Sequence, residues 1–171
     1  MPATYTLINS NVLTSSQSSI TFSSIPADYT DLVVRMSMRL SNASNQEYVQ
    51  FRLNGNSSSL YSDTWLRGDG ASASSSRDQD TYGWLEQTPG ANATANTFGS
   101  TEMYIPAYLV SGSKALGIFN VAENNDTTAY MAIIASLFRS NTGISSISFH
   151  PGSGGNFVSG SSFYLYGISN A

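Results

Sequence analysis

Few side chains in this sequence are suited to catalysis or to metal binding. His150 is the only histidine among the 171 residues, and the chain contains no cysteine. A catalytic triad or a zinc site built on His150 would therefore lack the partner residues it needs. His150 also precedes Pro151 at the end of an expected strand. We interpret it as a histidine in a surface turn.

The aspartates around residue 75 are of the right type to bind a cation. Asp69, Asp78 and Asp80 carry the hard oxygen ligands that Ca²⁺ prefers. Their spacing does not match a calcium-binding loop, however, and the serines between them are typical of an irregular segment. We therefore predict no metal site there, and no cofactor.

A second group of carboxylates lies on or near expected strands. A glycosidase needs two carboxylates that face each other across a cleft. Nothing in the sequence pairs any two of Asp63, Glu86 and Glu102 in this way. Because no other motif carries a mechanism, the sequence predicts a protein that is not an enzyme.

Three large aromatic residues flank the most polar part of the chain. Trp65 precedes residues 68–80, and Tyr82 and Trp84 follow them. Such side chains can pack in a core, anchor a protein interface or stack on a sugar. All three are candidates for contacts with a partner or with another subunit.

Two arginines share one face of an expected strand, residues 31–40. Leu32, Val34 and Met36 alternate with Val33, Arg35, Ser37 and Arg39. Side chains in a strand point alternately to opposite faces, so one face is apolar and the other carries both arginines. Arg35 and Arg39 are thus expected on an outer face, where they could meet carboxylates of a neighbouring subunit or partner.

The composition is that of an uncharged, hydrogen-bonding surface. Charged residues make up 11% of the chain and the net charge is −4, whereas about 25% of an average soluble domain is charged. Scattered arginines and a negative net charge argue against binding to nucleic acid. No stretch is long and apolar enough to span a membrane.

The first ten residues, "MPATYTLINS", lack the basic start and apolar core of a secretory signal. The chain is therefore expected to be made and to stay in the cytoplasm, although its surface is of the kind found on extracellular proteins. A virus particle reconciles the two, because its proteins assemble inside a cell and work outside it.

Short strands at nearly regular spacing account for most of the sequence. Eleven segments are candidates for strands: residues 4–8, 19–22, 31–40, 47–53, 60–67, 81–87, 97–105, 115–121, 128–139, 144–149 and 163–168. About eight to ten strands among them, with turns rich in Gly, Ser and Asn, favour an all-β fold, an antiparallel β-sandwich of the jelly-roll type. A length of 171 residues suits one domain, residues 1–171.

Three segments carry more specific expectations. Residues 47–53 and 60–67 should form a hairpin through the tight turn "NGN" at residues 54–56. Residues 68–80 should form a flexible polar loop. Residues 128–139 are apolar on both faces, which indicates a central strand covered by the other sheet and by a loop or a neighbouring subunit. A helix is the alternative for that last segment.

The two ends of the chain together resemble a group of small virion proteins of tailed bacteriophages. These share an opening "ITF–x–IP–x–Y–DL–x–aliphatic–R" and a closing "F–LYGI" strand. Residues 96–108 and 123–126 also look similar to that group. The positions that match the two motifs are Ile20, Thr21, Phe22, Ile25, Pro26, Tyr29, Asp31, Leu32, Arg35, Phe163, Leu165, Tyr166, Gly167 and Ile168.

The resemblance implies a jelly-roll-like fold and a structural role in a phage particle. The first expectation is a capsid decoration ("cement") protein that binds the major capsid protein on the outer surface of the head as a homotrimer. A tail-fibre or head-fibre component that binds a host receptor or glycan is the alternative. The chain has no fibrous repeat, which disfavours a complete fibre.

Overall fold

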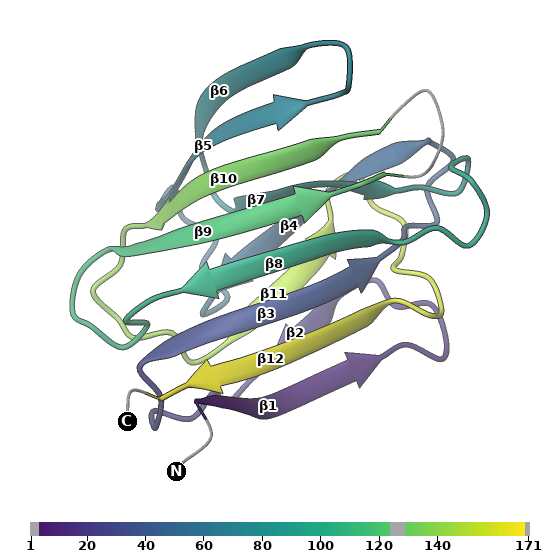
Figure 1. Cartoon of the computed structure of the whole chain (residues 1–171). Coiled ribbons are helices and arrows are strands. Elements are labelled where there is room, and N and C mark those ends of the chain that lie inside the picture. The colour runs from purple at the N-terminus through teal and green to yellow at the C-terminus, as the bar shows by residue number, and fades with distance from the viewer. Residues whose placement is uncertain (1–3, 124–128, 170–171) are drawn as a thin grey trace.

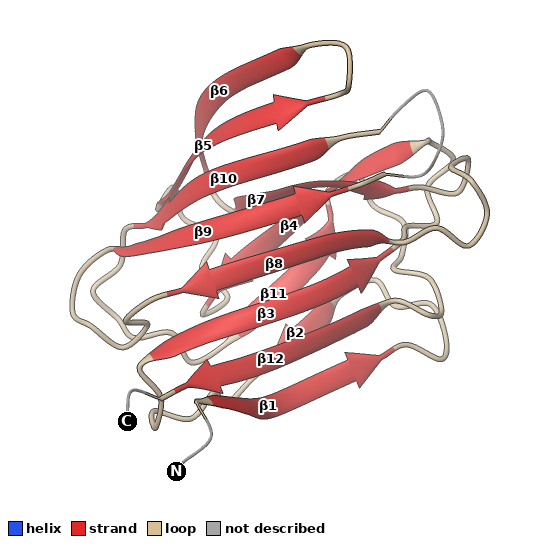
Figure 2. Ribbon diagram, viewed as in Figure 1, coloured by secondary structure: helices blue, strands red, loops and turns tan. Residues whose placement is uncertain are grey.

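A computed structural model describes residues 4–123 and 129–169. These residues form twelve strands and no helix (Figure 2), so none of them lies in a helix that could cross a membrane. The strands are β1 (Tyr5–Val12), β2 (Ile20–Phe22), β3 (Asp31–Met38), β4 (Gln46–Leu53), β5 (Tyr61–Gly68), β6 (Ala73–Asp80), β7 (Gly83–Pro89), β8 (Gly99–Ile105), β9 (Lys114–Val121), β10 (Met131–Phe138), β11 (Ile147–Pro151) and β12 (Ser162–Ile168).

The strands form two sheets that stack face to face (Figure 1). The larger sheet has the order β1-β12-β3-β8-β9-β10-β5-β6 and the smaller has the order β2-β11-β4-β7. Neighbouring strands are antiparallel throughout. One hydrophobic core, which includes Val34, Phe51 and Phe163, lies between the layers. The predicted antiparallel sandwich is therefore confirmed.

Eight of the strands have the strand order of a jelly roll. With β5, β6, β9 and β10 set aside, the remaining strands, counted along the chain, lie in the orders 1-8-3-6 and 2-7-4-5. Two interleaved Greek keys produce this arrangement. The other four strands extend the larger sheet beyond β8 (Figure 1). This extension distinguishes the chain from a plain eight-stranded jelly roll.

Strand β3 follows the expected alternation. Leu32, Val34 and Met36 are at most 4% exposed and face the core, whereas Arg35 is exposed on the outer face. Its neighbours in the larger sheet are β12 and β8. Burial of each apolar side chain contributes about 1.5–3 kcal/mol to stability, so this strand holds the two layers together.

Arg39 does not lie on the outer face, so that expectation is wrong. The pairing of β3 with β8 ends at Met38. Leu40 still faces the core, but the loop after β7 covers the Arg39 side chain. Arg39 is 9% exposed. Its guanidinium donates hydrogen bonds of 2.8–3.3 Å to four backbone carbonyl oxygens in the loop after β7. The acceptors belong to Ala91, Ala93, Thr94 and Thr97.

Residues 68–80 form most of a hairpin rather than a flexible loop, which corrects a second expectation. Strand β6 pairs with β5 along its whole length. In the turn at residues 69–72, the Asp69 carboxylate accepts hydrogen bonds from the backbone N–H groups of Ala71 and Ser72. Nearly all of β6 is exposed. Because both faces are polar, the strand lacks the alternation by which strands are recognised.

The expected tight turn exists, but the expected hairpin around it does not. Asn54 and Gly55 have φ angles of 54° and 62°, which a tight turn of this kind requires. Strand β5 then pairs with β10 and β6 in the other sheet instead of with β4. The buried Tyr61 hydroxyl accepts a hydrogen bond from the N–H of Leu53 at 3.0 Å, which fixes this crossing between layers.

Strand β10 lies inside the larger sheet, between β9 and β5, so the helical alternative is wrong. Ala132, Ile134 and Phe138 face the core, but Met131 and Ile133 are 51% and 57% exposed on the other face. That a neighbouring subunit covers this second face stays a prediction. Residues 124–128 lie outside the described part of the chain. They include the first residue of the expected strand 128–139 and most of residues 123–126, which resemble the phage proteins.

Candidate functional site

The outer face of the larger sheet is the first candidate surface. We use this name for the side chains of that sheet that point away from the smaller sheet. The strand register places Leu66, Ile133 and Phe119 side by side on β5, β10 and β9. The same row continues across β8, β3 and β12 through Glu102, Arg35 and Tyr164.

Exposed hydrophobic side chains are concentrated on this face. Of the ten large ones that are exposed among the described residues, only Leu109 and Val110 lie outside the larger sheet, in the loop after β8. Apolar groups gathered on one face mark an interaction surface. The eight on the outer face are Tyr5, Leu7, Val12, Leu66, Tyr104, Phe119, Met131 and Ile133.

Arg35 lies in the middle of the outer face, as the sequence predicts. Its Nε donates a hydrogen bond to Oε2 of Glu102 at 2.8 Å. The two side chains are 60% and 46% exposed, and an ion pair this open contributes at most about 1 kcal/mol to stability. Both groups can therefore exchange partners at little cost.

The second candidate surface is a groove of about 300 Å³ where the β5–β6 hairpin faces β7, the edge strand of the smaller sheet. We call it the aromatic groove. It brings together Trp65 and Trp84, two of the three aromatic residues predicted from the sequence, and Tyr82 contacts Trp84. Its lining consists of Tyr48, Trp65, Asp78, Gln79, Asp80, Trp84 and Glu86.

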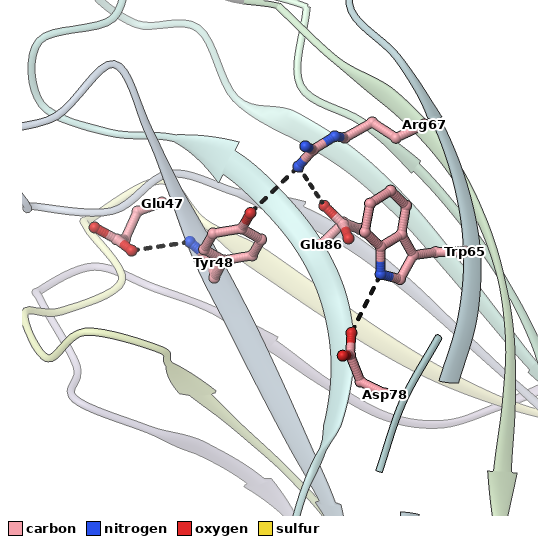
Figure 3. A network of polar contacts seen from close by, with 6 residues as sticks. All are labelled: Glu47, Tyr48, Trp65, Arg67, Asp78 and Glu86. Carbon is pink, nitrogen blue, oxygen red and sulfur yellow. Dashed lines mark hydrogen bonds and ion pairs between the residues drawn. The ribbon is translucent and has the colours of Figure 1, made fainter. Parts of the chain in front are cut away.

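Arg67 links the two sides of the aromatic groove (Figure 3). Its Nη1 donates a hydrogen bond to the hydroxyl of Tyr48 at 3.2 Å and lies 3.5 Å from Oε2 of Glu86. The guanidinium carbon is 5.0 Å from the centre of the Trp65 ring and 4.8 Å from that of Tyr130. These cation–π contacts and polar contacts hold Arg67 in one position.

Glu86 is a buried carboxylate at an irregular point of β7. Two residues, Leu85 and Glu86, stand opposite Val49 alone, because Gln87 pairs with Tyr48 while Trp84 pairs with Gln50. This is a β-bulge, and Glu86 has a φ of 65° within it. Bulges redirect side chains, and they often occur beside functional sites.

The electrostatic environment of Glu86 is set by burial. The residue is 4% exposed, and desolvation raises the pKa of its carboxyl, an effect that the Arg67 guanidinium partly offsets. Its Oε2 atom is buried and lies 3.5 Å from Nη1 of Arg67, which is longer than a good hydrogen bond. The Glu86 carboxylate is therefore held by an ion pair rather than by a close hydrogen bond.

The Trp84 ring is held by two tyrosines. The rings of Tyr82 and Tyr48 meet it edge-on, at centroid distances of 4.8 Å and 5.3 Å. On the β6 side, Asp78 accepts a hydrogen bond from Nε1 of Trp65 at 3.4 Å (Figure 3). All of these aromatic residues are half-buried, so they are neither core residues nor a flat exposed platform.

Asp63 lies behind the groove on β5 and is 2% exposed. Desolvation raises the pKa of its carboxyl to about 6, although the hydroxyl of Ser136 and the backbone N–H of Trp84 favour the ionised form. An ionised Asp63 is therefore costly to bury at neutral pH. Its position makes it a structural residue rather than a ligand-binding one.

The structure separates the residues considered for metal binding or catalysis. Asp69 is occupied by its own turn, away from Asp78 and Asp80. Across residues 4–123 and 129–169, no group of three or more His, Asp or Glu side chains is placed to hold a metal ion. His150 lies within strand β11 rather than in a turn, with Nε2 3.0 Å from the Ser148 hydroxyl.

Sequence reasoning missed Arg67 and Tyr48 and considered Glu86 only as a possible catalytic carboxylate. Arg67 and Glu86 follow Trp65 and Trp84 by two positions, the spacing of side chains on one face of a strand. In Glu86, however, it is the β-bulge and not the two-residue spacing that sets the direction of the side chain. Tyr48 could be found only from the pairing of β4 with β7.

Comparisons with known proteins add little. No protein-family model matches the sequence, and no curated protein is similar to it. Among solved structures, galectin LEC-6 of Caenorhabditis elegans is similar at a TM-score of 0.33 and 9% sequence identity, over 98% of this chain and 96% of that one. A likeness this weak carries no inference about function.

Proposed function

We propose that this chain is a non-enzymatic virion protein that decorates the outside of a bacteriophage capsid. In this proposal the outer face of the larger sheet docks on the major capsid protein and reinforces the shell. The observation that carries it is the concentration of exposed hydrophobic side chains on that one face. The resemblance of the two chain ends to tailed-phage virion proteins supports the choice of partner.

The size of the outer face suits such a role. Eight strands about 4.8 Å apart and roughly 25 Å long cover about 900 Å². A standard protein–protein interface buries about 800 Å² on each partner. The face is therefore large enough for a stable contact.

The charge of the outer face also favours contact with a protein shell. The outward-pointing side chains of its strands include two basic and two acidic residues: Asp31, Arg35, Arg77 and Glu102. Because the charges are few and balance, little charge would have to be desolvated on docking. Many copies on one shell would act together, so that each contact can be weak.

The test is binding of the purified protein to heads that lack it, measured by co-sedimentation. Leu7→Glu and Ile133→Glu place a charge at opposite ends of the outer face, and each should weaken binding at least tenfold. Thr21→Glu is the matched control, because Thr21 is exposed on β2 of the smaller sheet. Equal binding by all three variants would contradict docking through the outer face.

Location in the particle tests the capsid assignment itself. Immunogold labelling of virions should place this protein on the head. Labelling confined to the tail would exclude a decoration protein and favour a tail component.

A further inference from the structure

The aromatic groove has the groups that recognise a sugar. We infer that it binds a neutral glycan, with one or two sugar units held between Trp65, Trp84 and the carboxylates of Asp78 and Glu86. This inference does not depend on capsid docking. The groove lies on the side of β5 that faces the smaller sheet, and the outer face lies on the other side (Figure 1).

The first argument is the position of the two tryptophans. Trp65 comes from the larger sheet and Trp84 from the smaller one, and both line the same groove. Each is half-buried, which keeps the ring fixed while leaving part of its surface open. Indole rings offer large apolar surfaces at low entropic cost, and the C–H faces of a pyranose can pack on them.

The second argument is the set of acceptors. Ionised carboxylates only accept hydrogen bonds, whereas sugar hydroxyls can donate them. Glu86 lines the groove, and among the described residues its carboxylate is held only by the 3.5 Å ion pair with Arg67. Asp78 lines the groove as well, so two carboxylates are placed beside the tryptophans where sugar hydroxyls could donate to them. The backbone of Glu86 has a positive φ, a strained conformation, and this conformation sets the direction of its side chain.

The third argument is charge. The groove contains Asp78, Asp80 and Glu86 against the single guanidinium of Arg67, so an anionic ligand would be repelled. A cationic ligand is disfavoured as well, because the guanidinium of Arg67 already lies over one face of the Trp65 ring and would repel it. A neutral ligand rich in hydroxyl groups remains.

The fourth argument is size. The volume of about 300 Å³ is at the lower end of the range for small-molecule sites. It accommodates one or two sugar rings and leaves a longer chain to extend into solvent. A groove that stays open when the outer face is covered could hold a surface polysaccharide while the protein remains on a particle.

The experiment is a titration of intrinsic tryptophan fluorescence, preceded by a glycan array. The probes are neutral trisaccharides of glucose, mannose, galactose and N-acetylglucosamine, with sialyllactose and choline as anionic and cationic comparisons. At least one neutral trisaccharide should bind and change the fluorescence, and sialyllactose and choline should not. No response to any neutral probe in either assay, or a preference for choline or sialyllactose, would overturn the inference.

Variants then test the groove itself. Glu86→Gln keeps the shape of the side chain and removes its charge, and it should weaken binding of the responsive trisaccharide at least tenfold. Glu102→Gln, the same change on the outer face, should leave binding unchanged. Trp84→Phe provides a second variant in case Glu86→Gln alters folding, and it should also weaken binding. Unchanged binding in both groove variants would overturn the inference, whereas their unchanged co-sedimentation with heads would show that docking is separate.

Discussion

Two of the seven basic residues, Arg39 and Lys114, are buried and hold loops in place. Arg39 bonds to the loop after β7, and Lys114, which is 1% exposed, donates hydrogen bonds to the carbonyl oxygens of Ser140 and Thr142 at 2.7 Å and 2.6 Å. In both cases a buried charge is satisfied by backbone dipoles instead of by a carboxylate. The scarcity of cations on the surface follows in part from this use.

The two arginines of the opening segment should therefore respond differently to substitution. Arg39→Ala removes a buried guanidinium that bonds four carbonyl oxygens of the loop after β7 and should lower the free energy of unfolding by about 3 kcal/mol. Arg35→Ala removes only an exposed ion pair and should cost less than about 1 kcal/mol. Urea denaturation measures both. A similar small loss in the two variants would contradict the structural role of Arg39.

Asp63 should make stability depend on pH. Its pKa rises from 3.8 to about 6 on folding, so the folded state holds the proton more tightly than the unfolded state. Stability is then highest below the unfolded pKa and falls as the pH rises from about 4 to 6. One pKa unit corresponds to about 1.4 kcal/mol, which makes the loss about 3 kcal/mol above pH 6.

Comparison with Asp63→Asn isolates this effect. The amide has no charge to bury, so the free energy of unfolding of the variant relative to the natural protein should increase by most of about 3 kcal/mol between pH 4 and pH 8. Urea denaturation across that range measures the difference. A difference that does not vary with pH would show that Asp63 titrates normally.

At the scale of elements, the two faces of strand β3 have different roles. The inner face of β3 joins the two layers, and its outer face belongs to the candidate docking surface. Strand β6, at the edge of the larger sheet, is polar on both faces. Polar edge strands keep a sheet from pairing with other chains, so the extension can expose an apolar face without continuing into an aggregate.

Neighbouring positions on β3 should show the difference between its faces. Met36→Asp buries a carboxylate where a side chain is 4% exposed, and it should cost about 4 kcal/mol or more through lost apolar burial and desolvation. Ser37→Asp, one position along on the outer face, should cost less than about 1 kcal/mol. Thermal unfolding followed by circular dichroism compares them. Equal losses would mean that the alternation does not govern this strand.

At the scale of the whole molecule, the chain has two separate candidate binding surfaces. The outer face of the larger sheet is broad and apolar in parts, and the aromatic groove is small and acidic. Because they lie on opposite sides of β5, contacts at one need not block the other. This separation allows a protein to be attached to a particle and to hold a ligand at the same time.

Self-association is the remaining prediction at this scale. The resemblance to phage virion proteins and the uncovered apolar face of β10 together predict a homotrimer, which closed symmetry favours. Sedimentation equilibrium should then give three times the chain mass of 18.3 kDa. Only monomer at high concentration would contradict a preformed trimer. Ile133→Glu should shift the trimer towards monomer, whereas Leu7→Glu, on β1, should not.

Local chemistry was enough to predict much of this protein. The alternation in β3 and the Asn54 and Gly55 turn could be read from adjacent residues, because side-chain direction and backbone φ depend on near neighbours. The same holds for the fold class, since many short strands with polar turns have few other ways to bury their apolar faces.

Only the tertiary structure decided which strands became neighbours. Arg39 is buried by carbonyls more than fifty residues away, and β5 crosses to the sheet of β10 instead of returning along β4. The aromatic groove exists because Trp65 and Trp84 come from different sheets and because a bulge in β7 redirects Glu86. Such pairings depend on how the whole core packs, and a sequence pattern records only the local part of that competition.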